Sequence, residues 1–200
     1  MCKKEELGQL KREMEKADLT LKKGATNLVF GEGNPDAKIF FLGEGPGYYE
    51  DVKGRPFVGQ AGALLNQLLQ SIKVERNSVF ITNVVCYRPP NNRDPLPEEI
   101  GAFQLYIDKM IEIIKPKIVV TLGRFSMAKF LPGVKISIVH GSAFVVNWKG
   151  KEIKVVPMYH PAAALRNGDV MFQIKEDFLK LPGLLREINP KIDAKQMELI

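Results

Sequence analysis

The sequence predicts a three-layer α/β/α fold around a central four-stranded, mainly parallel sheet. Short apolar runs of strand length alternate with segments whose apolar residues recur at helical spacing. Right-handed crossovers between parallel strands bring their carboxyl ends to one edge, where such folds bind ligands. A hydrophobic content of 45% suffices for one core, and the amino-acid composition of neither half indicates a second domain. Residues 1–200 are therefore expected to form a single domain.

The first half of the chain is predicted to contain a βαβ unit preceded by a helix. Apolar residues recur every three or four positions over residues 7–21, as in an amphipathic helix. After a Gly-Asn-Pro turn, the run AKIFFL at 37–42 predicts a buried strand. Helical spacing over 61–72 and the run VFITNVV at 79–85 predict the helix and second strand.

The second half continues the alternation. Four prolines make 87–97 an extended loop, followed by a helix over 98–114, a strand at 118–122 and a short helix to about 130. Strands at 143–147 and 153–157, joined through Lys149 and Gly150, predict a hairpin whose second strand completes the parallel sheet. A last helix is expected over 172–188, and a loosely attached tail after Pro190.

Composition restricts the class of protein. A formal net charge of +6 is compatible with a polyanionic partner. Two cysteines, Cys2 and Cys86, are too few for a disulfide framework or a four-thiolate metal site. The N-terminus lacks an apolar signal core and no run approaches the ~18 apolar residues of a membrane span. We therefore expect a cytoplasmic protein without membrane contact.

The stretch 41–65, FLGEGPGYYEDVKGRPFVGQAGALL, is the most distinctive of the chain. Five glycines follow the first predicted strand, and they allow backbone N–H groups to approach a ligand closely. Three carboxylates (Glu44, Glu50 and Asp51) and the aromatic Phe57 lie in the same segment. An ordinary strand–helix connection is the alternative, but the length and chemistry of this loop favour a site for a flat polar ligand.

Two further polar residues are predicted to reach the same edge of the sheet. Asn83 lies in an apolar strand, where its amide pairs either with neighbouring backbone or with the edge of an amide-like ligand. His160 follows the last predicted strand in YHPAAAL, opposite the Gly-rich loop, and its imidazole is suited to donate to an oxygen that gains negative charge. The other histidine, His140, is interpreted as incidental or as a backbone contact.

Three motifs in this order resemble those of the family 4 uracil-DNA glycosylases: GEGPGYYEDVKGRPFVGQAGALL, TNVVCYRPPNNRDPLPEEI and YHPAAALRNG. The resemblance covers about residues 31–180. It implies a DNA repair enzyme that flips uracil out of single- or double-stranded DNA and hydrolyses its N-glycosidic bond, leaving an abasic site. No motif indicates a nucleophile or a lyase lysine, so a monofunctional hydrolase is expected, and we expect it to act as a monomer.

The resemblance also implies roles for single residues. Phe57 matches the aromatic that stacks on the flipped base, and Asn83 the amide that binds its Watson–Crick edge. His160 matches the histidine that donates to uracil O2 as the bond breaks. Glu50 matches a carboxylate that positions or activates water. Catalytic roles are thus expected for His160, Glu50 and Asn83.

The first motif and the basic residues complete the expected site. Glu44 and Gly45 match positions that contact the base. A related family carries Asp where Gly45 stands, so activation of the water here is either weaker or rests on Glu50. Leu165 and Arg166 resemble the loop that enters or props the duplex. Arginines around the mouth are expected to contact phosphates, namely Arg88, Arg93, Arg124 and Arg166.

The sequence departs from the family at its iron–sulfur cluster. Family members typically bind a four-iron cluster through four cysteines, and the matching positions here are Lys16, Leu19, Tyr87 and Phe103, none of which replaces a thiolate. Cys86 is adjacent to one of them, but a single cysteine does not rescue the site. We expect no cluster and no metal, with the three apolar residues packed together in its place.

Three alternatives remain at this stage. The first is a catalytically weakened DNA-binding member of the same fold, and the second is a glycosylase of broader deaminated-base specificity. A nucleotide-binding enzyme is the third, but the loop lacks a Walker lysine and GxGxxG spacing.

Overall fold

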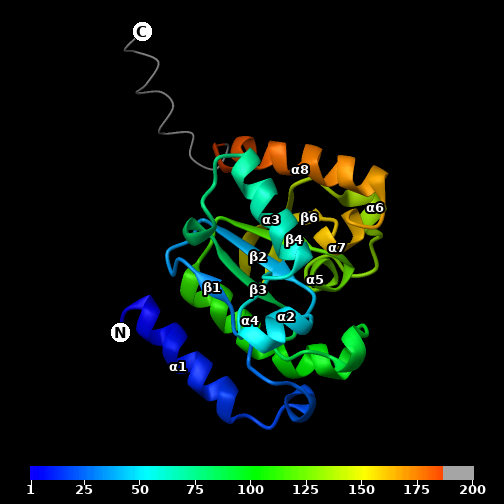
Figure 1. Ribbon diagram of the computed structural model, residues 1–200. Coiled ribbons are helices and arrows are strands. Elements are labelled where there is room, and N and C mark those ends of the chain that lie inside the picture. The colour runs from blue at the N-terminus through cyan, green and yellow to red at the C-terminus, as the bar shows by residue number, and fades with distance from the viewer. Residues whose placement is uncertain (187–200) are drawn as a thin grey trace.

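A six-stranded sheet with the order β1-β3-β2-β4-β6-β5 forms the centre of the computed structural model, which describes residues 1–186 (Figure 1). Its four inner strands are parallel: β3 (Phe80–Asn83), β2 (Ile39–Gly43), β4 (Ile118–Leu122) and β6 (Lys151–Met158). They are the predicted central sheet. The edges are antiparallel, β1 (Glu32–Gly33) beside β3 and β5 (Phe144–Trp148) beside β6. Two residues are too few to show alternation, which is why β1 was interpreted as part of a turn.

Helices cover both faces of the sheet, as the α/β/α prediction requires. α1 (Lys3–Lys16) and α4 (Pro97–Ile114) pack on the face to which Phe40 and Leu42 point. α3 (Gln60–Ser71) and α8 (Gly168–Arg186) cover the opposite face, where Ile39 and Phe41 point. Successive residues of β2 therefore alternate between two cores, and all five are buried because neither face of a parallel sheet meets water.

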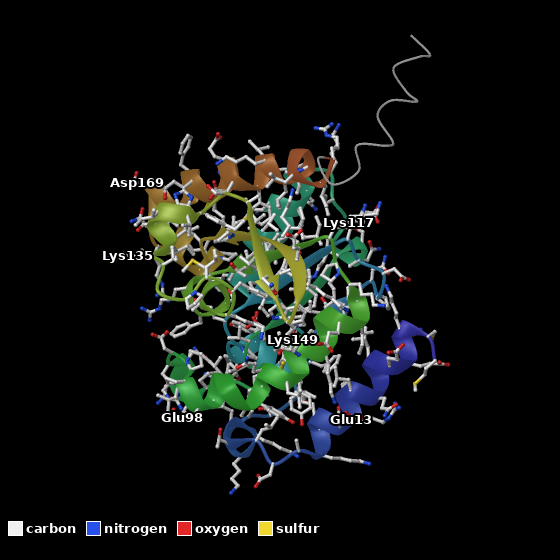
Figure 2. All side chains as sticks on the ribbon, turned by 180° about the vertical axis from the view of Figure 1, so that it is seen from behind. Glu13, Glu98, Lys117, Lys135, Lys149 and Asp169 are labelled. Carbon is white, nitrogen blue, oxygen red and sulfur yellow. The ribbon has the colours of Figure 1, made fainter. Side chains whose placement is uncertain are left out.

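Ion pairs join the outer elements of the first layer. Figure 2 views the molecule from behind, with Glu13 on α1 and Lys149 at the turn of the β5–β6 hairpin. Glu13 lies 3.6 Å from Lys109 of α4, and the Lys149 Nζ lies 2.9 Å from Glu112 on the same helix. The hairpin turn itself is the predicted one: Lys149 and Gly150 both have positive φ, as a two-residue turn between twisted strands requires.

Several boundaries differ from the predicted ones. α1 ends at Lys16 because Ala17 is extended, and the apolar pattern up to Leu21 continues into a 3-10 turn (Thr20–Gly24). α8 begins at Gly168, four residues before the predicted start at 172. The expected helix end at 188 and the tail after Pro190 lie outside the described residues.

The remaining helices are short and lie in the connections. They are α2 (Tyr48–Lys53), α5 (Arg124–Ala128), α6 (Ile136–Val139) and α7 (Pro161–Ala164), with 3-10 turns at Arg76–Ser78 and Pro90–Asn92. α2 was not predicted, because two glycines bound it within the Gly-rich loop; the second, Gly54, ends it in a left-handed conformation with a φ of 64°. No helix among residues 1–186 is long and apolar enough to cross a bilayer.

The strand order brings the predicted site segments to one edge. Gly43 pairs with Asn83 at the ends of β2 and β3, and the N–H of Gly123, after β4, donates to the Met158 carbonyl at the end of β6 at 2.9 Å. Asn83 is the last residue of its strand and not central in it, since Val84 and Val85 already leave the sheet. His160 follows β6 as the residue that caps α7.

Candidate active site

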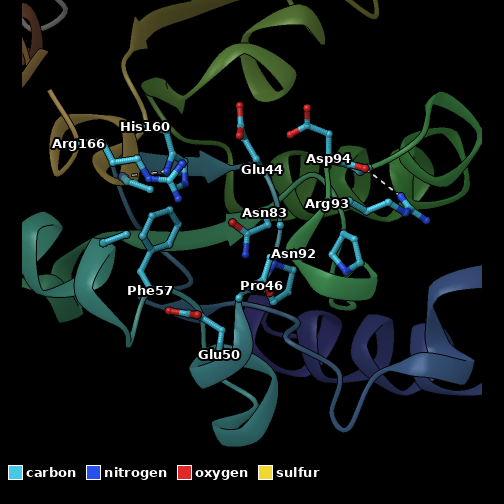
Figure 3. A pocket seen from close by; sticks show the side chains of 16 residues that line it. Glu44, Pro46, Glu50, Phe57, Asn83, Asn92, Arg93, Asp94, His160 and Arg166 are labelled. Atoms are coloured by element: carbon cyan, nitrogen blue, oxygen red, sulfur yellow. Dashed lines mark hydrogen bonds between the residues drawn. The ribbon is translucent and has the colours of Figure 1, made fainter.

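A pocket of about 300 Å³ opens at the carboxyl ends of the four parallel strands (Figure 3). Of the predicted residues it brings together Glu44, Gly45, Glu50, Phe57, Asn83, Arg93, His160 and Arg166. Three predicted DNA-contacting residues, Arg88, Arg124 and Leu165, do not line it. The volume is at the lower end of that of small-ligand sites.

Phe57 forms one wall of the pocket and is held in a strained backbone conformation. Its φ of 50° is in the left-handed region, which an aromatic residue rarely adopts. Two glycines make room for it: a methyl group on Gly43 would lie 2.7 Å from the Phe57 ring, and one on Gly62 would lie 1.9 Å from the Phe57 carbonyl oxygen. The ring is 5.5 Å from that of His160 between centroids.

Glu50 fixes the segment that carries this ring. Its Oε1 accepts hydrogen bonds from the backbone N–H groups of Val58 and Gly59, each at 2.8 Å. Those are the two residues after Phe57, and they lead into α3, so the carboxylate also complements the positive end of that helix. The second oxygen, Oε2, engages no described hydrogen-bond donor and lies beside Gly47 on the pocket rim.

Asn83 has an unsatisfied polar atom. The residue is 1% exposed, and its Oδ1 has no hydrogen-bond partner among the described residues. A methyl group on Gly43 would lie 2.3 Å from this oxygen, so Gly43 allows the amide and the Phe57 ring to flank the same space. A buried oxygen without a partner costs about 1–3 kcal/mol, which a ligand that donates to it would offset.

His160 is fixed in one tautomer. Its Nδ1 accepts the N–H of Ala162 at 3.1 Å, so the proton of the neutral ring is on Nε2. Burial lowers the pKa of His160 to about 4, and Glu50 acts in the opposite direction to a smaller extent. The ring is therefore neutral at physiological pH and provides an N–H donor to the pocket.

Glu44 is half-buried in the lining of the pocket. Burial raises its pKa, and the N–H of Phe125, which donates to its Oε1 at 3.3 Å, partly counteracts this effect. Gly123 has a φ of 102°, and a methyl group there would lie 2.3 Å from the same oxygen. The start of α5 thus wraps around the carboxyl group.

The predicted arginines fall into two groups. Arg93 makes two hydrogen bonds to the buried Glu99, at 2.8 and 2.6 Å, and Arg124 is paired with Asp94. Arg88 and Arg166 have no carboxylate partner among residues 1–186. Leu165, next to Arg166, is 46% exposed.

Sequence reasoning missed some of the lining. Asn92 and Asp94 contribute from the proline-rich loop, Pro46 from the Gly-rich loop, and Ala61 and Ala162 from the starts of α3 and α7. The loop at 87–97 follows β3, so its position after a parallel strand was a signal that this loop would reach the site.

His140 makes a contact with a side chain and not the backbone contact that was one of the two expectations for it. Its Nδ1 lies 2.7 Å from Oδ2 of Asp177, a carboxylate that is 1% exposed on α8. Its ring also packs at 4.7 Å between centroids against Tyr159. The contact ties the end of α6 to α8 and lies outside the pocket lining.

The positions that match the family's cluster ligands do not fit a cluster. Leu19, Tyr87 and Phe103 are buried in one apolar core, with 6.1 Å between the Tyr87 and Phe103 ring centroids, whereas Lys16 is exposed. Burial raises the pKa of the neighbouring Cys86 thiol to about 12. No group of three or more potential metal ligands occurs within residues 1–186.

Comparison with known proteins gives consistent results. The family model of the uracil DNA glycosylase superfamily matches residues 30–181. A type-4 uracil-DNA glycosylase of Sulfurisphaera tokodaii is 51% identical over 172 residues, which cover 83% of this chain and 77% of the relative. One from Archaeoglobus fulgidus is 44% identical, covering 86% and 89%, and one from Thermotoga maritima is 45% identical, covering 81% and 85%.

Proposed function

This chain belongs to the type-4 enzymes of the uracil-DNA glycosylase superfamily, and we propose that it removes uracil from DNA by hydrolysing the bond between the base and its deoxyribose. The C1′–N1 bond breaks with its electron pair on the base, a water oxygen bonds to C1′, and the water's proton neutralises the uracil anion. The product is an abasic site. A base reaches such a pocket only after leaving the duplex stack.

The observation that carries the proposal is the unpaired Oδ1 of Asn83 beside Phe57. Uracil presents an N3–H donor next to the O4 acceptor, and a side-chain amide complements both. The Phe57 ring replaces the stacking that the base loses on flipping. Glu44 and Gly45, on the same rim, are proposed to contact the base from the first loop.

His160 is proposed to stabilise the departing base. Negative charge develops over N1 and O2 of uracil as the bond breaks, and the Nε2–H of a neutral imidazole is a donor for that charge. A donor of this kind binds the transition state better than the substrate, and therefore accelerates the bond-breaking step.

Glu50 is proposed to have two functions, one for each oxygen. Oε1 holds the Phe57 segment through Val58 and Gly59. Oε2 remains for the attacking water. Because an amide oxygen also accepts these two hydrogen bonds, Glu50→Gln separates the positioning role from the water role.

We further propose that the chain functions without an iron–sulfur cluster. The packing of Leu19, Tyr87 and Phe103 in one apolar core supports this, since a cluster needs four thiolates and space. Iron analysis of the purified protein should give less than about one iron per chain, and an iron chelator should leave uracil release unchanged. About four irons per chain would refute the proposal.

The unit of function is proposed to be residues 1–200, acting as a monomeric single domain in the cytoplasm on single- or double-stranded DNA. The proposal is tested with a uracil-containing oligonucleotide and an otherwise identical one that contains cytosine. Alkali-labile strand scission at uracil and not at cytosine is expected. No scission in either single or double strands would exclude the activity.

A further inference from the structure

Beside the pocket lies a cluster of Tyr48, Tyr49 and Arg88, of which only Arg88 has been given a role, as an expected phosphate contact. Tyr48 and Tyr49 begin α2 and are 56% and 58% exposed, which is unusual for two neighbouring large side chains. Their rings meet edge to face at 5.5 Å between centroids. They directly follow Pro46 and Gly47, both of which line the pocket.

Arg88 joins this pair to the opposite loop. Its guanidinium carbon lies 5.3 Å from the centroid of the Tyr48 ring, and its Nε donates to Oδ1 of Asn92 at 2.7 Å. Asn92 lines the pocket. The guanidinium is thus oriented from two sides, while its two terminal nitrogens have no partner among residues 1–186.

The other unneutralised arginine of the rim is on the far side of the pocket. Arg166 follows His160 and α7, beyond the end of β6, whereas Arg88 follows β3. The order β3-β2-β4-β6 places two strands between the strand ends that these arginines follow, so those ends are about 14 Å apart at ~4.8 Å per strand. Figure 3 shows Arg166 beside His160 and Asn92 across the pocket from them.

We propose that the DNA strand carrying the uracil crosses the pocket mouth from Arg166 to a clamp formed by Tyr48 and Arg88. In the clamp, the exposed part of the Tyr48 ring stacks on a base next to the flipped uracil, and the terminal nitrogens of Arg88 bind a backbone phosphate. The inference rests on the proposed function, because the pocket between the two arginines must receive the flipped base. Arg93 and Arg124 are already paired with carboxylates and are not required for this path.

The chemistry of the clamp fits an extended nucleic-acid strand. Aromatic faces bind unstacked bases of any sequence, and Arg supplies both charge and two donors to a phosphate. A purely structural role for the same contacts is to tether α2 to the proline-rich loop. That role uses the Tyr48 ring only through its contact with Arg88, so Tyr48→Leu should then have no further effect on Kd in an Arg88→Ala background, whereas a ring that stacks on a base predicts a raised Kd there too.

Binding of a fluorescent single-stranded oligonucleotide to the full chain, followed by anisotropy, distinguishes the two roles. The oligonucleotide carries one 2′-fluorinated deoxyuridine, whose fluorine slows bond cleavage. Tyr48→Ala and Tyr48→Leu should each raise Kd at least about fivefold, and Tyr48→Phe should stay within about twofold of the wild type. Leu179→Ala, which truncates an equally exposed apolar residue on α8 (56%), is the matched control and should not change Kd.

The salt dependence of the same binding tests the arginines. Each phosphate contact to a single strand contributes about 0.7 to the slope of log Kd against log salt. Arg88→Ala and Arg166→Ala should each lower the slope by about that amount. Lys38→Ala removes an exposed charge at the opposite end of β2 and should leave the slope unchanged.

The clamp would be overturned by any of three results. Tyr48→Ala could bind with the Kd of the wild type, Tyr48→Leu could bind like Tyr48→Phe, or Arg88→Ala could keep the salt slope of the wild type. Anisotropy does not require turnover. Failure of the clamp therefore appears as unchanged binding in these variants, whereas failure of the proposed function appears as absence of uracil release by the wild type.

Discussion

Two regions that lie four residues apart in the chain have opposite character. Asn83 ends β3 with a buried amide oxygen that has no partner among residues 1–186, whereas Tyr87, just beyond it, packs its ring against Phe103 in a closed apolar core. The pocket thus keeps a polar atom that the described part of the chain leaves unsatisfied, at a cost to stability. The apolar region is satisfied by its own side chains. This contrast is the one expected if the pocket receives a ligand and its neighbour only stabilises the fold.

The largest expected effect is a loss of stability in the apolar region around Phe103. Phe103 is fully buried, so Phe103→Ala should lower the free energy of unfolding by about 3–5 kcal/mol, measured by urea denaturation. The rate of uracil release per folded molecule should change little, because the residue does not line the pocket. A large loss of kcat in the remaining folded protein would show that the two regions are coupled.

The opposite pattern is expected for the pocket. Asn83→Ala should lower kcat about 100-fold or more, in the range found when one preorganised polar contact to a transition state is removed. Its free energy of unfolding should hardly fall, because the amide oxygen has no partner to lose. Single-turnover kinetics and urea denaturation on one preparation measure both. A variant that unfolds readily but retains its rate would contradict the assignment.

Substitutions of Glu50 should change kcat and KM by intermediate amounts. Two different substitutions separate the two functions that we propose for this residue. Glu50→Ala removes the acceptor of two backbone N–H groups and should reduce the rate about tenfold or more, with a raised KM because Phe57 is no longer held. Glu50→Gln keeps the acceptor and should restore KM to near that of the wild type. If kcat of Glu50→Gln is still below that of the wild type, the difference is due to the missing charge of the carboxylate. If the two variants were equally impaired in KM, Oε1 would not position the ring.

The comparison also shows what sequence alone could reveal. Parallel strands ending at Gly43, Asn83 and Leu122 are encoded locally, as apolar runs followed by a turn or a polar residue, and so the edge that carries the pocket was predictable. The ion pairs of Arg93 and Arg124 depend on residues brought together by folding, and local patterns contain no such information. The contact of His140 with Asp177 was missed for the same reason, because Asp177 lies 37 positions away in the sequence.

The smallest expected effect is a pH dependence confined to the pocket. The pKa of His160 is about 4 in the folded chain, below its ordinary value of ~6.5, because burial disfavours the charged ring. Between these values the unfolded chain binds more protons than the folded one, so the stability contributed by His160 is present above about pH 6.5 and is lost as pH falls towards 4.

This difference is measurable by urea denaturation between pH 7.5 and 4.5 in the wild type and His160→Gln. The variant should lose part of the pH slope of the unfolding free energy, whereas Phe103→Ala should keep it, since the apolar region has no such titrating ring. The Nε2–H donor also persists over this range, so His160 should impose no step in the rate of uracil release near pH 6.5. A step at that pH that disappears in His160→Gln would mean that the ring titrates as an exposed histidine, and the fixed neutral donor would have to be abandoned.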